Sequence, residues 1–225
     1  RIPRLPAPND FDTLLWEFTI TWRELKMPVA NINGRDIYYE QHGEGTEWIT
    51  LLNGLTMNTA SWVPQLAEFP KHFRVLLLDM CGQGKSAMPQ EDIYPLTRQA
   101  DDVAALLDQL GIAKTHLLGI SYGGVVAQHL VMGHRAKVDK LVLVDTLAHS
   151  DAVTAALWES LVQAQAAGGQ HLRYQIMLPL AFGSRFLELI AGMIPRMEEA
   201  EAQVPWHAIK ALSEGVRGVD MRPHY

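Results

Sequence analysis

A serine stands between glycines in residues 119–124, which read Gly-Ile-Ser-Tyr-Gly-Gly. An apolar run at 116–118 precedes it, and a helix-like stretch rich in small residues follows at 123–132. A serine hydroxyl is a poor nucleophile unless it is held exposed beside a base, and a sharp strand-to-helix turn presents it in that way. Glycines two positions before and after Ser121 allow such a turn. We therefore predict that Ser121 is an acyl-transfer nucleophile rather than part of an ordinary glycine-rich turn.

Strand and helix patterns alternate around this turn. The dipeptide at 33–34, Asn-Gly, favours a type I′ hairpin turn between two β-type runs within 29–40. Continuous apolar runs at 48–52, 73–78, 115–118 and 138–144 are typical of strands that are covered on both faces. Helical patterns occupy 62–69, 100–110 and 123–132 between them. This order predicts an α/β protein with a mostly parallel sheet and helices on both faces.

The strand pattern stops after Ser150. Residues 150–225 are rich in Ala, Leu, Glu and Gln and contain breaks at Pro179 and Pro195, so we predict a helical cap region. A run at 174–180 could be a strand, but Pro179 within it argues against one. Residues 27–149 then form the core through a sixth strand. Residues 1–26, proline-rich and then aromatic, are interpreted either as an appended or mobile segment or as a helix over 10–25 that docks on the body.

Three segments carry a family resemblance. Residues 51–56 read Leu-Leu-Asn-Gly-Leu-Thr, residues 79–86 read Asp-Met-Cys-Gly-Gln-Gly-Lys-Ser, and the third segment is the serine turn. Their order and spacing resemble the α/β-hydrolase family from about residue 29 onward, although Asn53 stands where that family has histidine. The resemblance implies an oxyanion hole formed by the backbone N–H groups of Leu55 and Tyr122. Because those donors belong to the main chain, Asn53 is compatible with it.

The type of nucleophile narrows the chemistry. Relatives that open epoxides or displace halide carry a carboxylate at this turn, whereas Ser121 implies an acyl-enzyme formed from an ester, a thioester, a lactone or an activated C–C bond. The sequence therefore predicts a serine hydrolase of the carboxylic ester type. Its expected partner is a small-molecule, ester-like substrate.

The partners of Ser121 are not evident in the sequence. The resemblance implies an acid after a seventh strand and a histidine after an eighth, and these residues include neither strand. None of the nine histidines follows a late strand. Asp145, after the sixth strand, is a candidate acid, with a strand-end turn as the alternative interpretation. A catalytically inactive truncated hydrolase or pseudo-enzyme with a binding role is thus the alternative function. An open sheet edge at 138–144 would favour self-association.

Composition and motif spacing argue against several other classes of protein. The net charge is −6 and the 19 Lys and Arg residues are scattered, which argues against nucleic acid as a partner. The single cysteine, Cys81, requires no oxidising compartment, so a cytoplasmic location is the default. No apolar run reaches the ~20 residues of a membrane span. Gly-Lys-Ser at 84–86 lacks the upstream glycine of a phosphate loop. The histidines show no metal-ligand spacing, and no metal or organic cofactor is expected.

Overall fold

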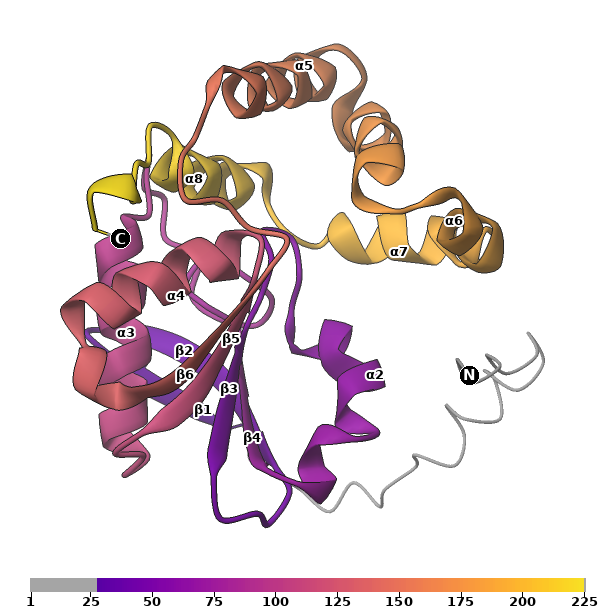
Figure 1. Ribbon diagram of the computed structural model, residues 1–225. Coiled ribbons are helices and arrows are strands. Elements are labelled where there is room, and N and C mark those ends of the chain that lie inside the picture. The colour runs from indigo at the N-terminus through magenta and orange to yellow at the C-terminus, as the bar shows by residue number, and fades with distance from the viewer. Residues whose placement is uncertain (1–27, 225) are drawn as a thin grey trace.

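The computed structural model describes residues 28–224. Its centre is a six-stranded sheet, and the order of the strands is β1-β2-β4-β3-β5-β6 (Figure 1). The strands are β1 (Val29–Ile32), β2 (Arg35–His42), β3 (Trp48–Leu52), β4 (Arg74–Leu78), β5 (Thr115–Ile120) and β6 (Val138–Val144). The pairs β4–β3, β3–β5 and β5–β6 are parallel, and the pairs β1–β2 and β2–β4 are antiparallel. The predicted α/β class with a mostly parallel sheet is confirmed.

The opening hairpin forms where the sequence predicts it. Asn33 and Gly34 both have positive φ angles, 49° and 81°, as a type I′ turn requires. Polar and charged side chains of the hairpin also bind helix α3. Asp102 of α3 (Leu96–Gln109) accepts hydrogen bonds from Asn33 at 2.8 Å and from Arg35 at 2.7 Å. This buried contact connects the hairpin to the first long helix.

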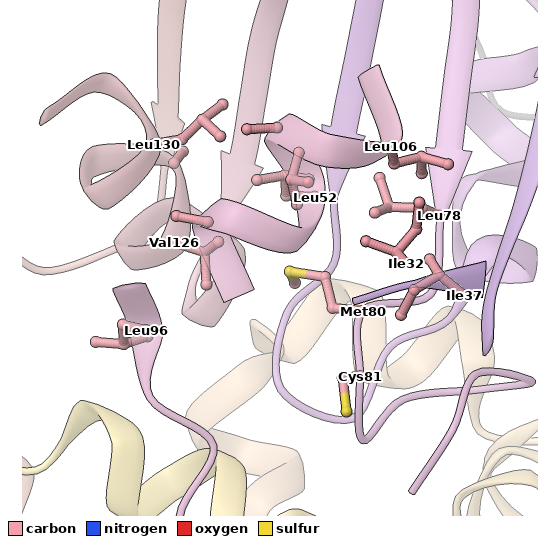
Figure 2. Close-up of a cluster of buried hydrophobic side chains, with 14 of the residues drawn as sticks. Ile32, Ile37, Leu52, Leu78, Met80, Cys81, Leu96, Leu106, Val126 and Leu130 are labelled. Atoms are coloured by element: carbon pink, nitrogen blue, oxygen red, sulfur yellow. The ribbon is translucent and has the colours of Figure 1, made fainter. Parts of the chain in front are cut away.

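Two apolar clusters cover the two faces of the sheet. Successive side chains of a strand point to opposite faces, so Leu52 and Leu78 join one cluster while Leu51 and Leu77 join the other. The larger cluster lies between the sheet and helices α3, α4 (Tyr122–Gly133) and α8 (Trp206–Val216) (Figure 2). The smaller cluster contains Trp62. Both faces of β3 and β4 are therefore covered, which explains why these strands read as unalternated apolar runs.

The helical pattern predicted over 62–69 is replaced by three short pieces. These are η1 (Thr59–Trp62), α2 (Val63–Leu66) and η2 (Phe69–Lys71). Pro64 and Pro70 each lie in the first turn of a piece, where a missing N–H costs nothing, but neither allows a helix to continue through it from the preceding turn. The result is a compact set of turns beside the sheet rather than one helix (Figure 1).

Residues after Ser150 are helical. The elements are α5 (Ala152–Ala181), α6 (Ser184–Ile190), α7 (Ile194–Glu201), α8 and the short η4 (Arg222–His224). Pro179 lies inside α5 and ends no helix; the break in α5 is at Gly168 and Gly169, which have non-helical backbone angles. The run at 174–180 is therefore helix, not strand. Arg173 of α5 donates to Glu201 of α7 at 2.8 Å, a buried ion pair that joins these helices.

Helix α8 differs from the rest of the predicted cap region. Its residues Ala208, Ala211 and Leu212 belong to the main core cluster. The carbonyl of Ala211 also accepts a hydrogen bond from the N–H of Tyr94 at 3.0 Å. Helices α5, α6 and α7 instead arch away from the sheet (Figure 1). The C-terminal part of the predicted cap thus packs as a component of the core, and the domain boundary after 149 stays a prediction.

Strand β6 is at one edge of the sheet. Leu141, Val142, Leu143 and Val144 are all more than one third exposed. Within residues 28–224, no helix is long and apolar enough to cross a membrane. The interpretations of residues 1–26 concern positions outside the described residues, so neither is tested.

Candidate active site at the carboxyl edge of the sheet

Ser121 lies between β5 and α4 in a strained backbone conformation. Its φ is 50° and its ψ is −117°, a combination that a residue with a side chain adopts only when its surroundings enforce it. Hydrogen bonds to the end of β6, to the chain after it and to the next helix supply that enforcement. The Ser121 N–H donates to the carbonyl of Val144 at 3.0 Å, and the Ser121 carbonyl accepts from the Thr146 hydroxyl at 2.7 Å and from the Gly124 N–H at 2.9 Å. The side chain of Ser121 is exposed, as a nucleophile must be.

The glycines around Ser121 are required by close backbone contacts. A Cβ atom on Gly119 would lie 2.4 Å from the carbonyl oxygen of Gly123. One on Gly123 would lie 2.4 Å from the carbonyl oxygen of Leu52, and one on Gly124 would lie 2.5 Å from the Thr146 hydroxyl. Real Cβ contacts are not this short. Helix α4 therefore begins directly against β3 and β5, and Ser121 is held at the carboxyl edge of the sheet.

The turn after β3 lies beside the serine. A Cβ atom on Gly54 would be 3.7 Å from the Cβ of Ser121. Among the described residues, the backbone N–H groups of Leu55 and Tyr122 have no hydrogen-bond acceptor. Two free N–H groups, one on the residue after an exposed serine and one in the turn beside it, are the components of an oxyanion hole. The arrangement agrees with the roles predicted for Leu55 and Tyr122, which stay predictions.

Asn53 has a structural role. Its amide donates to the carbonyl of Leu78 at 2.9 Å and to Asp79 at 3.2 Å, and its oxygen accepts from the Trp62 indole at 2.7 Å. All of these groups are buried. Asn53, which stands where the family has histidine, therefore holds the start of the turn after β3 against β4 and Trp62. It leaves the N–H of Leu55 free.

Asp79, directly after β4, organises the loops around the site. Its carboxylate accepts from the N–H of Thr59 at 2.8 Å and from the N–H of Lys85 at 2.9 Å, in addition to Asn53. Burial raises the pKa of Asp79 above its usual range, although these three hydrogen bonds act in the opposite direction. Gly84 completes the contact, because its φ is +48° and any Cβ there would overlap the carboxylate.

Two other polar side chains near the site are excluded from the chemistry. The phenol of Tyr122 is fully buried, and burial raises its pKa well above the usual range. Burial likewise raises the pKa of the Cys81 thiol to about 11. A buried, protonated thiol is unreactive. Tyr122 can thus act only through its backbone, and Cys81 is a core residue (Figure 2).

Asp145 follows β6 and lies next to the turn. It is exposed, its φ is 43°, and its neighbours Val144 and Thr146 are the residues that bind the Ser121 backbone. In the described part of the chain, no histidine forms a hydrogen bond or ion pair with Ser121 or with Asp145. The histidines with side-chain partners contact groups elsewhere: His42 with Glu40, His72 with Glu68, His116 with Glu47 and Asp139, His134 with Asp101, His171 with Glu198 and His207 with Gln90. The role of Asp145 stays a prediction.

Comparison with known proteins identifies the family. A family model described as the alpha/beta hydrolase fold matches residues 47–182. The chain belongs to the α/β-hydrolase family. It is 31% identical over 183 residues to the "Putative carbamate hydrolase RutD" of Azorhizobium caulinodans, covering 80% of this chain and 66% of that protein. It is 32% identical over 129 residues to the "Putative carbamate hydrolase RutD" of Caulobacter vibrioides, covering 56% of this chain and 47% of that protein.

Solved structures agree with this assignment. The enol-lactonase from Burkholderia xenovorans LB400 superposes with a TM-score of 0.78 at 28% identity, over 87% of this chain and 75% of that one. A hydrolase from Pseudomonas aeruginosa gives a TM-score of 0.78 at 27% identity, over 88% and 75%. The chain therefore spans between about half and two thirds of the curated relatives, and three quarters of these solved structures.

Two residues of the site were missed by sequence reasoning. Thr146 binds the Ser121 carbonyl, and Gln83 binds the turn at 54–55. Both contacts join residues that are at least 25 positions apart in the chain. The position of Gln83 between two glycines of the loop was a signal that the loop approaches another backbone closely. Thr146, a common residue after a strand, gave none.

Replacing Gly123 with alanine tests the close packing of the turn at Ser121 against β3. The Gly123→Ala side chain would overlap the Leu52 carbonyl, so we expect a loss of about 2–3 kcal/mol in the free energy of unfolding. Gly133→Ala, in the same helix but with open space around it, should change that free energy by less than about 1 kcal/mol and in the stabilising direction. Urea unfolding of both variants decides. Equal effects of the two substitutions would contradict the close approach of α4 to β3.

Glu40 of β2 gives the free energy of unfolding a pH dependence. Its carboxylate accepts from the Tyr38 hydroxyl at 2.9 Å and contacts His42 at 3.0 Å. These hydrogen bonds, that to His42 foremost, lower the pKa of Glu40 from 4.5 to about 2. The resulting stabilisation is complete above the unfolded-state value and is lost as the pH falls from about 4.5 to about 2.

Glu40→Gln should remove this dependence. The difference in unfolding free energy between the wild type and the variant should be constant from pH 7 to about 5 and should shrink below pH 4.5, since the glutamine does not titrate. Urea unfolding at several pH values measures it. The exposed Glu44→Gln is the control and should show no such change between pH 5 and 3. A difference that grows on acidification would be inconsistent with a lowered pKa.

Proposed function

We propose that this protein is a serine hydrolase that cleaves a small carboxylic ester, thioester or lactone through an acyl-enzyme on Ser121. The observation that carries the proposal is the strained, exposed serine beside two free backbone N–H groups. The Ser121 hydroxyl gives up its proton to a base as its oxygen attacks the carbonyl carbon, and the N–H groups of Leu55 and Tyr122 stabilise the oxygen anion that develops. The bond to the alcohol or thiol then breaks, this leaving group takes up the proton, and the acyl group remains on Ser121. Water attacks the acyl-enzyme in the same way, so the acid is released and the proton returns to the serine oxygen. No metal or organic cofactor takes part in these steps.

The relatives support this class of substrate. One solved structure is named an enol-lactonase and several curated relatives are named as carbamate hydrolases. A lactone and a carbamate share a carbonyl carbon that bears a heteroatom leaving group, which is the group an acyl-enzyme mechanism requires. We assign the same reacting group to this protein's substrate. Asp145 is the proposed acid, because it adjoins the residues that hold Ser121. The proposed location is cytoplasmic.

Labelling with a fluorophosphonate tests the function. An activated serine reacts covalently with this probe, so we expect stoichiometric labelling of the wild type and none of Ser121→Ala. Ser160→Ala, which removes an exposed hydroxyl from α5, is the control and should label like the wild type. Intact mass spectrometry measures the bound phosphonate. A wild type that stays unlabelled while a control hydrolase reacts would favour the alternative function, an inactive binding protein.

Hydrolysis of p-nitrophenyl esters with acyl chains of different lengths then distinguishes substrate sizes. Ser121→Ala should lower any rate by several orders of magnitude. A weak rate would not by itself establish a complete triad, because an oxyanion hole and binding retain part of the catalysis.

The exposed edge at β6 supports a second, separate proposal, self-association through this strand. Val142 is 45% exposed on the edge strand, and an uncovered apolar edge pairs with other strands. Val142→Lys should shift the sedimentation coefficient toward that of the monomer, since a lysine on an edge opposes pairing. The control is Val153→Lys at a 75% exposed position of α5, which should leave the distribution unchanged. Identical distributions for all three proteins would exclude β6 as the contact.

A further inference from the structure

The side chain of Gln83 connects the loop after β4 to the turn beside Ser121. It is 1% exposed. Its amide nitrogen donates to the carbonyl of Gly54 at 2.7 Å and lies 3.3 Å from the carbonyl of Leu55. Its amide oxygen accepts from the N–H of Met80 at 3.3 Å, which leaves the nitrogen directed at the turn. Gln83 thus contacts the turn only through two carbonyl oxygens.

The Gly54 carbonyl belongs to the same peptide unit as the N–H of Leu55. In a trans peptide the C=O and the N–H point in opposite directions, so fixing one fixes the other. The carbonyl receives two donors: Gln83 and, within the turn, the N–H of Met57 at 3.2 Å. The Met57 contact moves with the turn, whereas Gln83 is anchored in another loop. Gln83 is therefore the contact that sets the orientation of this peptide relative to the body.

We propose that Gln83 is a positioning residue that holds the Gly54–Leu55 peptide with the Leu55 N–H directed at the developing oxyanion on Ser121. This inference rests on the proposed function. Gln83 does not touch the substrate; it acts through the peptide. Gly54 lies against Ser121, so a small rotation of this peptide moves the donor relative to the nucleophile. Complete removal of an oxyanion-hole donor slows a serine hydrolase by roughly 10²- to 10³-fold, and misorientation should cost part of that.

The sequence allows this one peptide to be observed directly. Gly54–Leu55 is the only Gly-Leu pair in the 225 residues. Protein labelled with carbonyl-¹³C glycine and ¹⁵N leucine therefore gives a single amide signal in an NMR experiment that selects ¹³C–¹⁵N pairs, and that signal is the Leu55 N–H. We expect one sharp signal in the wild type.

Gln83→Met and Gln99→Met form a matched pair. Gln99 is also buried, and its amide donates to the carbonyl of Cys81 at 2.7 Å in the same loop, but it does not reach the turn. We expect the Leu55 signal to shift and broaden in Gln83→Met and to stay in place in Gln99→Met. The rate of fluorophosphonate labelling should fall about tenfold or more in Gln83→Met. An unmoved Leu55 signal in folded Gln83→Met, or an equal shift of that signal in the two variants, would overturn the proposal.

A second variant covers the case in which Gln83→Met does not fold. Gln83→Glu keeps the shape of the side chain, and its carboxyl can donate to the Gly54 carbonyl only while it is protonated. The Leu55 signal should therefore approach its wild-type position at low pH and depart from it as the pH rises; a signal independent of pH would overturn the proposal. If the wild type is not labelled at all, the proposed function fails, and the Leu55 signal still decides whether Gln83 orients the peptide.

Discussion

The site depends on one buried carboxylate at the carboxyl edge of the sheet. Asp79 receives hydrogen bonds from Thr59, Lys85 and Asn53, which belong to three separate segments of the chain. Its burial raises its pKa, so the carboxylate is costly in the folded state unless all three donors remain in place. Because losing one donor would leave the buried carboxylate poorly paired, the three segments that supply the donors are expected to fold cooperatively. The loop at 79–86 and the turn at 53–59 must assume their positions together, and with them Gln83 reaches the Gly54 carbonyl.

The strain at Ser121 is sustained from the opposite side. A positive φ at a residue with a side chain costs on the order of 1–3 kcal/mol, and the local sequence alone would not maintain it. The neighbouring strand β6 supplies the carbonyl of Val144, and the chain after it supplies the hydroxyl of Thr146. The glycines of the turn add no attraction; they permit α4 to approach the carbonyl of Leu52 closely. Ser121 is thus held between two parts of the structure, the loops around Asp79 on one side and β6 on the other.

Local patterns predicted the elements, and long-range contacts decided the details. The Asn33-Gly34 turn, the strand at 138–144 and the serine elbow depend on neighbours in sequence, and each was found as predicted. The prediction of one helix over 62–69 was wrong. The spacing of the apolar residues was typical of a helix, but separate short pieces begin near Pro64 and near Pro70. Helix α8 has the amphipathic pattern of any surface helix, so its sequence could not show that its apolar face packs against the core instead of the cap.

The contacts of Asp79, Gln83 and Thr146 were beyond sequence reasoning for a related reason. Each contact joins segments that only the folded sheet brings together. A polar side chain in a loop has many possible hydrogen-bond partners, and its local sequence does not favour one of them.

The exposed edge strand and Ser121 are physically linked. Strand β6 pairs with β5 on one side only, and its residues 141–144 are exposed. The same strand ends at Val144, whose carbonyl holds the N–H of Ser121. An edge strand has fewer hydrogen bonds and less apolar cover than a central one, so it opens at lower free energy. Local opening of β6 would release Val144 and Thr146 together, and the strained backbone of Ser121 would then relax. Any strand that covers this edge therefore stabilises the backbone geometry of Ser121 without touching Ser121 itself.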